Sequence, residues 1–357
     1  MKKLDLYVLR ELTVPFLIGT IAVVLMFQAN LLIFQLKTFS ISAVPIAATL
    51  QLILYNTPQY LNMTLPVGTA LAASLAISRL TRESELTAMR SAGASILRVI
   101  LPITAFGAIV GVGNYLIAER VMPKAQLEAR KLMMQVGLLG ALPEFKNNIT
   151  VNLPKYSVNV GSVTRIDSRT LLLNRILLYE RPDPDVTVFI QAESGEYRDG
   201  IWRLRDTFHW RFEGLNLIRA QPGKDVVINE KISFESIFAP PLPEEKTTEE
   251  LKQAIREGAR AGFDTTWLQE VYHSRFSVPA ACVVFALAGA VFAAAFARGG
   301  GFVGVLVSII IVFLYYNGFV ISMEVLGKNG IVSPFLAAWL PNFAFLVLGA
   351  IGLRRLE

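Results

Sequence analysis

The stretch Ser78–Ser95, SRLTRESELTAMRSAGAS, lies between two long apolar runs and carries three arginines and two glutamates. Its apolar residues, with Ile96 just beyond it, are spaced so that a short helix would have one apolar side: Leu80, Leu86, Met89 and Ile96. On such a helix the charged side chains stay in water, and Gly93 can end it. The pattern predicts a short amphipathic helix at about 80–93, or a solvated connector whose arginines only fix membrane topology.

The two neighbouring runs belong to a set that is long enough to cross a membrane. The chain has 357 residues, of which 53% are hydrophobic and 17% charged, with a mean hydropathy of +0.48. It is too apolar for an ordinary soluble protein and too charged for a membrane bundle throughout. About 20 helical residues span the hydrocarbon core, and six runs meet this length: Leu12–Leu36, Leu50–Ile77, Leu97–Ala118, Val278–Ala297, Phe302–Met323 and Pro334–Leu353.

A block without a spanning run, residues 122–270, separates the first three spans (1–121) from the last three (271–357). It holds 20 basic and 21 acidic residues, so the chain's net charge of +6 arises at the membrane flanks. Because a basic patch on a soluble face is missing, nucleic acid is not an expected partner. Short runs rich in β-branched and aromatic residues, separated by turn signals, predict a sandwich, jelly roll or open barrel.

The flanking charges predict the orientation of the chain. Lys and Arg in short loops stay cytoplasmic, and most of them lie on the side that holds both termini and the stretch 78–95. Both termini are therefore expected in the cytoplasm and the inserted block outside it. The one cysteine, Cys282, falls in the fourth span, so this block is expected to fold without an intrachain disulfide.

Other local signals concern helix ends and helix packing. Thr247 and Glu250 form a capping-box pattern at the start of a helix that Gly262 can stop. In the second span, Pro58 and Pro66 predict a kink unless neighbouring groups satisfy the freed carbonyls. Glycines in the third and fourth spans permit close helix approach: Gly107, Gly111, Gly113 and Gly289.

The sequence offers little for catalysis. It has no Walker A loop, no HExxH or CxxC pattern, and two histidines 64 positions apart, so no metal or cofactor is expected on this chain. Any ATP-driven function needs a partner that supplies the nucleotide site. A lipid-headgroup enzyme would have four candidates near the outer face: Glu119, Glu270, His273 and Glu324. They show no paired spacing, and Glu119 can instead form an ion pair with Arg275.

Four segments resemble, in order, one family of membrane proteins. They are YVLRELTVPFL (7–17), LPVGTALAASLAISRLTRESELTAMRSAGAS (65–95), EVYHSRFSVPAACVVFALAG (270–289) and PFLAAWLPN (334–342). Together they are similar to the LptF/LptG (YjgP/YjgQ-type) permeases of the lipopolysaccharide-export ABC transporter. The resemblance covers essentially the whole chain. It implies a polytopic α-helical inner-membrane protein with six transmembrane helices and a periplasmic β-jelly-roll-like domain between helices 3 and 4.

The resemblance also implies partners and a coupling site. Two such permeases, or two copies of one, would bind a cytoplasmic ABC ATPase dimer that carries ATP and Mg²⁺. They would pass lipopolysaccharide or another envelope lipid to periplasmic bridge proteins of jelly-roll type. The segment 80–93 would be a coupling helix, in which Glu85 meets an arginine of the ATPase. Its supporting residues would be Arg82, Glu83, Arg90 and Gly93.

Candidate lipid contacts follow from the same resemblance. Aromatic residues of the inserted block are expected to line a greasy interior, or to be plain core: Phe189, Trp202, Phe208, Trp210 and Phe212. On the fifth span Asn317 and Glu324 are candidates for the cavity or lateral gate, although Glu324 can equally cap a helix end. Where the family places several basic residues at the outer end of helix 1, this chain has only Lys37, which leaves room for a less phosphorylated glycolipid. The alternative function is a mechanotransmitting ABC subunit that moves its outer domain without carrying lipid.

Overall fold

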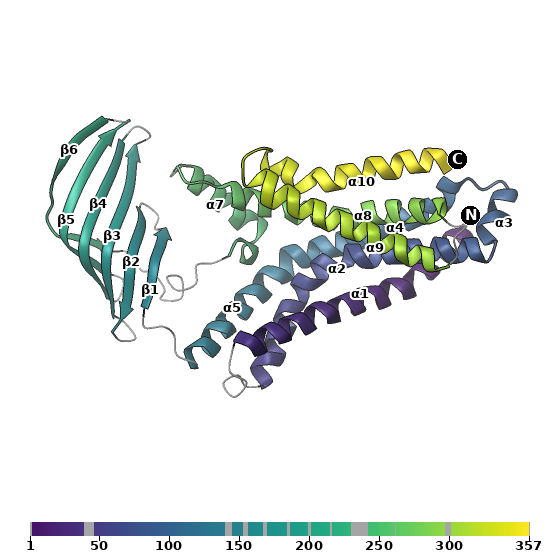
Figure 1. Cartoon of the computed structure of the whole chain (residues 1–357), viewed down its shortest axis with the longest axis horizontal. Coiled ribbons are helices and arrows are strands. Elements are labelled where there is room, and N and C mark those ends of the chain that lie inside the picture. Colours follow the sequence, from purple (N-terminus) through teal and green to yellow (C-terminus); the bar gives the residue numbers. More distant parts are fainter. Residues whose placement is uncertain are drawn as a thin grey trace. The chain divides into compact units, whose positions relative to one another are not determined.

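A computed structural model of the chain contains two compact units. One unit comprises Met1–Leu132 and Pro243–Glu357 and is helical, and the other comprises Met133–Leu242 and holds the β-strands (Figure 1). The structure describes residues 2–38, 46–139, 145–152, 156–166, 170–183, 186–198, 201–214, 216–229, 242–260, 262–296 and 301–356. The β unit is narrower than the block 122–270, because helices on both sides of it group with the membrane helices.

Six described helices, some built from consecutive segments, are long and apolar enough to cross a membrane, which confirms the six predicted spans. They are α1 (Lys2–Thr38), α2 (Ile46–Arg82), α4 (Ile96–Leu116) with η1 (Ile117–Val121) and α5 (Met122–Leu139), α8 (Thr266–Ala295), α9 (Gly301–Val320) with η4 (Ile321–Gly327), and α10 (Pro334–Leu356). Three short helices complete the set: α3 (Glu85–Ser91), η2 (Pro243–Glu245) and α7 (Thr248–Arg260). The π-helical turn η1 carries the third span on past Ala118 into α5.

Helices α2 and α8 form the centre of the helical unit. In their most apolar stretches 61% of the residues are buried, against 11% in α1 and 28% in α9 and α10. Close packing of α4 on α8 depends on glycine, because a Cβ on Gly107 would lie 2.6 Å from Ala286 Cβ and one on Gly111 would lie 2.8 Å from the Pro279 carbonyl oxygen. A Cβ on Gly289 would lie 3.1 Å from the Ala70 carbonyl oxygen of α2. A Cβ on Gly113 would meet no described atom within 4 Å, so that glycine does not mediate the packing.

Two carbonyls that prolines free in the spans find partners on neighbouring helices. In α2, Pro66 removes the donor for the Asn62 carbonyl, and the Asn114 side chain of α4 donates to that oxygen at 3.0 Å. In α10, Pro341 frees the Ala337 carbonyl, which accepts from the Ser322 hydroxyl at 2.6 Å. These bonds satisfy backbone groups that lipid cannot. α2 continues as one helix through both Pro58 and Pro66.

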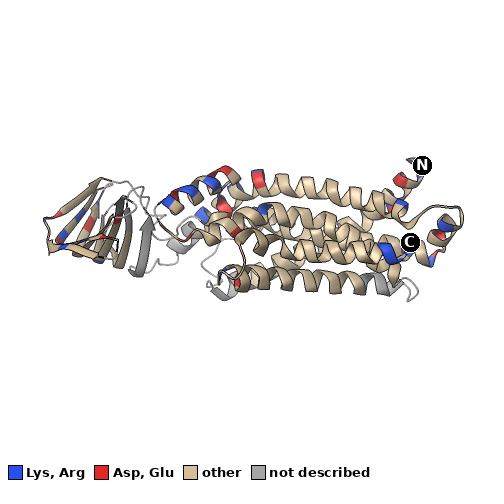
Figure 2. Ribbon diagram, turned by 90° about the horizontal axis from the view of Figure 1, so that it is seen from above, with Lys and Arg blue, Asp and Glu red and all other residues tan. Residues whose placement is uncertain are grey.

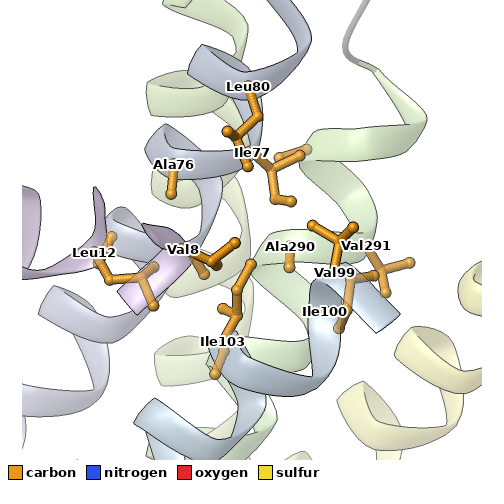
Figure 3. Packing of buried hydrophobic residues seen from close by; sticks show 14 of the residues in the cluster. Val8, Leu12, Ala76, Ile77, Leu80, Val99, Ile100, Ile103, Ala290 and Val291 are labelled. Atoms are coloured by element: carbon orange, nitrogen blue, oxygen red, sulfur yellow. The ribbon is translucent and has the colours of Figure 1, made fainter. Parts of the chain in front are cut away.

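An apolar cluster fills the end of the helical unit that carries α3. Figure 3 shows Val8 of α1, Ile77 of α2, Ile103 of α4 and Val291 of α8 converging from four helices. Each of these side chains is fully buried. α3 joins the cluster through Leu86 and the partly buried Met89, so one apolar side fixes the short helix. It is shorter than the predicted 80–93, because Leu80 lies in α2 and Ile96 begins α4.

The β unit is one antiparallel sheet with the order β1-β2-β3-β4-β5-β6. Its strands are β1 (Phe145–Asn152), β2 (Tyr156–Arg165), β3 (Thr170–Asp183), β4 (Val186–Arg198), β5 (Ile201–Glu213), β6 (Asn216–Pro222) and β7 (Val226–Asn229). β6 pairs with one half of β5 and β7 with the other half. The inserted antiparallel β domain is confirmed, and its strands β1 to β6 follow one another as a meander.

A line of four residues that the ladder pairing leaves out crosses the sheet, and the alternation of the strands reverses there. They are Gly161 of β2, Arg175 of β3, Glu193 of β4 and Asp206 of β5, and the strand register is the same on both sides of them. Arg175 and Asp206 have positive φ angles of 53° and 54°, which is uncommon for residues other than glycine. As a result, the buried face changes from even-numbered to odd-numbered residues, or the reverse, where a strand crosses this line.

The helix α7 begins with the capping box that the sequence predicted. The Thr247 amide donates to Glu250 Oε2 at 2.7 Å, and the Glu250 amide donates to Thr247 Oγ1 at 3.4 Å. These bonds, the amide bond first, lower the pKa of the Glu250 carboxyl. Gly262, with a φ of 76°, follows the end of the helix.

Replacing Thr247 with alanine is expected to destabilise α7 by about 1 kcal/mol, because one capping acceptor is lost. Hydrogen exchange of the first-turn amides of α7 in the full chain measures this. Glu249→Gln, which removes only an exposed pair with Lys252, is the control and should cost a few tenths of a kcal/mol. Because the pKa of Glu250 is lowered in the folded chain, its stabilisation should be present at neutral pH and be lost as the pH falls through that pKa. Equal protection in the Thr247 variant and the parent would contradict the prediction.

Candidate functional site

The short helix α3 connects α2 to α4 at the end of the helical unit where α1 begins and α10 ends (Figure 1). It ends in a Schellman motif: the Gly93 amide donates to the Arg90 carbonyl at 2.9 Å, and the Ala94 amide donates to the Met89 carbonyl at 3.0 Å. Gly93 has a φ of 88°, which explains the glycine at this position. The predicted helix end at Gly93 is therefore confirmed.

Glu85, the predicted coupling residue, is half-buried at the start of α3. The Tyr7 hydroxyl of α1 contacts both carboxylate oxygens, at 3.0 Å to Oε1 and 2.8 Å to Oε2. The sequence placed Glu85 on the wet side with Arg82, Glu83 and Arg90, and these three are exposed. Glu85 differs from them because the first turns of α1 pass beside it.

Further polar contacts connect the beginning of α1 to α2 and α4. Arg98 of α4 pairs with Asp5 of α1 at 2.7 Å. Arg79 of α2 pairs with Glu11 of α1 and, at 3.2 Å, with Glu83. The beginning of α1 is therefore held against α2, α3 and α4 by charged and polar groups.

The C-terminal end of α3 is joined to the last helix. The Arg90 guanidinium donates to the Leu356 carbonyl of α10 at 3.3 Å. Arg82 lies 3.9 Å from Glu83 and is exposed. Figure 2 shows that the charged residues of the helical unit gather at its two ends, with few in between. The α3 end thus presents a polar surface on a well-packed base, which suits contact with a soluble protein.

At the other end of the helical unit, a buried arginine organises a polar network. Arg275 of α8 is 3% exposed and pairs with Glu119 of η1 at 3.5 Å, which confirms the predicted ion pair. Glu119 also accepts from the amide and the hydroxyl of Thr248, at the start of α7. The Arg275 guanidinium donates to the carbonyls of Pro243 and Glu244 at 3.5 and 3.3 Å. Polar groups that are buried away from water need partners within the protein. The bonds of Arg275 and Glu119 therefore fix η2 and α7 on the spans.

A second ion pair joins the two chain segments that lead into the β unit. Arg130 Nε of α5 lies 2.9 Å from Glu245 Oε1 of η2, and both side chains are largely buried. Arg130 lies just before Met133 and Glu245 just after Leu242, where the β unit begins and ends. The segments on both sides of this unit are therefore connected to each other within the helical unit.

The remaining polar candidates have separate surroundings. Glu324 pairs with Lys328 one turn along η4 and is exposed, and Asn317 is exposed and donates to its own helix at the Phe313 carbonyl, 2.8 Å away. His273 contacts the ring of Phe335, with 5.4 Å between centroids. Among the described residues no group of three His, Cys, Asp or Glu is placed to hold a metal ion. Lys37 lies in the last turns of α1, and its side chain is outside the described residues.

Glu270 is the most buried of the acidic candidates. It is 1% exposed, and its carboxylate fits against Gly327 of η4, where a Cβ would lie 2.0 Å from Oε1. Glu119, Glu324 and His273 have the different partners given above. Glu119 thus belongs to the Arg275 network, whereas Glu270 fits against η4, the turn that also carries Glu324.

The five aromatic candidates of the β unit do not share one surface. Trp202 is fully buried on the core face and contacts Tyr197, with ring centroids 5.3 Å apart. The pairings of Phe189 with Trp210 and of Gln191 with Phe208 put the other aromatics on the opposite face. There Phe189 contacts Phe212 at 5.8 Å, and all of them are half-buried. The expectation of a single aromatic-lined interior is corrected, because the alternation of β5 reverses at Asp206, between Trp202 and Phe208.

Sequence reasoning did not find two of the residues that hold these sites. Tyr7 is only the first residue of the segment 7–17 that carries the family resemblance, and no sequence pattern singles out Thr248. Each reaches a carboxylate far away in the chain, Glu85 and Glu119 respectively. A tyrosine among charged residues at a span end was the one available signal, because its hydroxyl needs a polar partner when the ring is partly buried.

Comparison with known families agrees with this architecture. No curated protein matches the chain. The family model described as lipopolysaccharide export system permease LptF/LptG matches residues 6–355, nearly the whole length. The match includes the six spans, α3 and the inserted β domain. The chain is therefore a multi-pass inner-membrane protein and a transport permease rather than an enzyme, and it belongs to the LptF/LptG family of lipopolysaccharide export permeases.

Proposed function

We propose that this chain is the membrane subunit of an ABC transporter that extracts lipopolysaccharide, or a related envelope lipid, from the inner membrane and passes it to a periplasmic bridge. The observation that carries the proposal is α3. It is a short helix with a carboxylate, Glu85, held at a polar end of the helical unit by Tyr7. A cation of a cytoplasmic ATPase would bind that carboxylate and push on α2 and α4, which α3 connects.

The proposed orientation places the α3 end, with both termini, in the cytoplasm and the β unit in the periplasm. The excess of Lys and Arg in the short loops on that side supports it. The lipid would then meet the outer halves of the spans before it reaches the β unit. Extraction must be driven, because each acyl CH₂ is stabilised in the bilayer by about 0.8 kcal/mol.

The proposed partners supply what this chain lacks. An ATPase dimer would bring ATP and Mg²⁺, and a second permease, or a second copy of this chain, would complete the cavity. The apolar surfaces of α1 and α9 are largely exposed in the described chain, which leaves them for lipid or for that second permease. Jelly-roll bridge proteins would receive the lipid from the β unit.

The lipid-binding candidates differ in how accessible they are to a lipid. Phe189, Phe208, Trp210 and Phe212 form one half-buried aromatic surface, which is available for acyl chains, whereas Trp202 is part of the core. Asn317 is proposed to face the cavity or gate, and Glu324 is held by Lys328. Lys37 is the only basic residue near the outer end of α1. The part of the substrate that meets this end is therefore proposed to carry fewer phosphates.

The Glu85→Ala variant is expected to lose the ATPase, because a charge-assisted contact of about 1.5–3 kcal/mol disappears. Wild-type and variant proteins are purified in mild detergent from native membranes, and copurified proteins and lipids are identified by mass spectrometry. The wild type should retain an ABC ATPase and a glycolipid. Glu257→Ala on α7, an exposed carboxylate away from α3, is the matched control and should retain both.

Two results would contradict the proposal. An ATPase that copurifies without enriched lipid would favour the mechanotransmitting alternative, in which the β unit moves and no lipid is carried. The absence of any ATPase from well-folded wild-type protein would remove the ABC partnership itself.

A further inference from the structure

The short helix α3 does not by itself fix the direction of Glu85. It has seven residues, and a helix of this length is not stable alone. Its N-cap residue, Ser84, has a left-handed backbone with a φ of 60° and makes no side-chain capping bond. Glu85 follows directly, in the first turn, so its side chain depends on tertiary contacts for a defined orientation.

Tyr7 provides such a contact from a distant part of the chain. Its hydroxyl lies 2.8 Å from one carboxylate oxygen of Glu85 and 3.0 Å from the other, 78 positions away. The ring of Tyr7 packs against the apolar cluster beneath α3, so the hydroxyl has a fixed position. A phenol donates one proton, whereas a carboxylate has about four acceptor sites. Tyr7 therefore orients Glu85 and leaves most of its acceptor sites for another donor.

We propose that Tyr7 is the positioning residue of the coupling site: it holds the Glu85 carboxylate in the orientation that the cation of the ATPase binds. The inference rests on the proposed function and adds a residue to it. The contact also connects α1 to any movement of α3 that the ATPase drives. α1 is bound to α4 through Asp5 and Arg98 and to α2 through Glu11 and Arg79, so a displacement of α3 reaches the first span directly.

The Tyr7→Phe variant tests this, because it removes the hydroxyl and keeps the ring. The full-length permease in nanodiscs is titrated with the ABC ATPase that copurifies with it, and both the Kd and the ATP turnover at saturation are measured. We expect about a tenfold weaker Kd with little change in saturated turnover, since one charge-assisted bond orients the binding group. In a Glu85→Gln background the same substitution should change the Kd less than twofold, because the charge that Tyr7 orients is already absent.

The background comparison separates positioning from a purely structural role. If Tyr7 only stabilised the packing of α1, Tyr7→Phe would weaken binding by the same factor in both backgrounds, and the proposal would be wrong. Tyr115→Phe is the matched control: its ring stacks on Phe276 at 5.5 Å on the third span, and its loss of a hydroxyl should leave the Kd unchanged.

Failure of this inference is distinguishable from failure of the proposed function. An unchanged Kd in Tyr7→Phe, together with a lost ATPase in Glu85→Ala, would overturn the role of Tyr7 and leave the coupling role of Glu85 intact. Wild-type permease that binds no ATPase would overturn both.

Discussion

Replacing Arg275 with methionine is expected to lower the free energy of unfolding of the helical unit by about 3–5 kcal/mol, the range for breaking a buried ion pair from one side. The arginine is 3% exposed and serves Glu119 and the carbonyls of Pro243 and Glu244. Methionine fills much of the volume but donates no hydrogen bond. Glu119 then keeps its charge with only Thr248 as a described donor.

Equilibrium unfolding of the full chain in mixed detergents measures the loss. Lys328→Met is the control, since its pair with Glu324 has side chains that are 48% and 56% exposed and should contribute at most about 1 kcal/mol. Adding Glu119→Gln to Arg275→Met should recover part of the loss, because the uncompensated charge is removed. Equal effects of the Arg275 and Lys328 variants would show that the network does not stabilise the bundle.

This network also shows which features of the fold could be predicted from the sequence. Glu119 ends the third apolar run and Arg275 precedes the fourth, so topology alone put their charges on one side of the membrane, where pairing is favourable. The Thr247–Glu250 capping box and the Gly93 helix end were predictable for a related reason. Each depends on residues three or four positions apart, and such spacing fixes local geometry.

Contacts between distant segments could not be predicted in this way. Nothing in the segment that contains Tyr7 identifies Glu85 as its partner, because the crossing of α1 over α3 is set by the whole bundle. The length of the third span was also underestimated. The apolar run stops near Ala118, but the helix continues through η1 into α5, and Glu119 on η1 binds Arg275 and Thr248.

The aromatic residues of β5 show the effect of one residue on a prediction. Trp202 and Trp210 are an even number of positions apart, so a regular strand would place both on one face. Asp206, with a φ of 54°, lies between them and changes the alternation. Trp202 consequently pairs with Tyr197 on the buried face, and Trp210 pairs with Phe189 on the other. No glycine marks this position of β5, so the reversal could not be predicted.

Trp202→Ala is therefore expected to destabilise the β unit by about 3–5 kcal/mol, the range for removing a fully buried Trp. Trp202 is 0% exposed and contacts the Tyr197 ring within the aliphatic cluster of the sheet. Trp210→Ala removes the same atoms from the half-buried opposite face, where its main ring contact is Phe208 at 4.7 Å. It should cost less than about half as much, because its site can fill with water and leaves no closed cavity.

Hydrogen exchange of β2–β5 amides in the full-length protein distinguishes the two tryptophans without isolating the β unit. If exchange follows global opening of the sheet, the Trp202 variant should exchange at least about a hundred times faster, and the Trp210 variant much less so. Similar acceleration in both would mean that the reversal at Asp206 does not divide the aromatics between two faces. Lipid copurification gives the complementary result: a stable Trp210→Ala protein that retains less lipid would assign the outer aromatic surface to the substrate, whereas undiminished lipid would leave that surface without a role in transport.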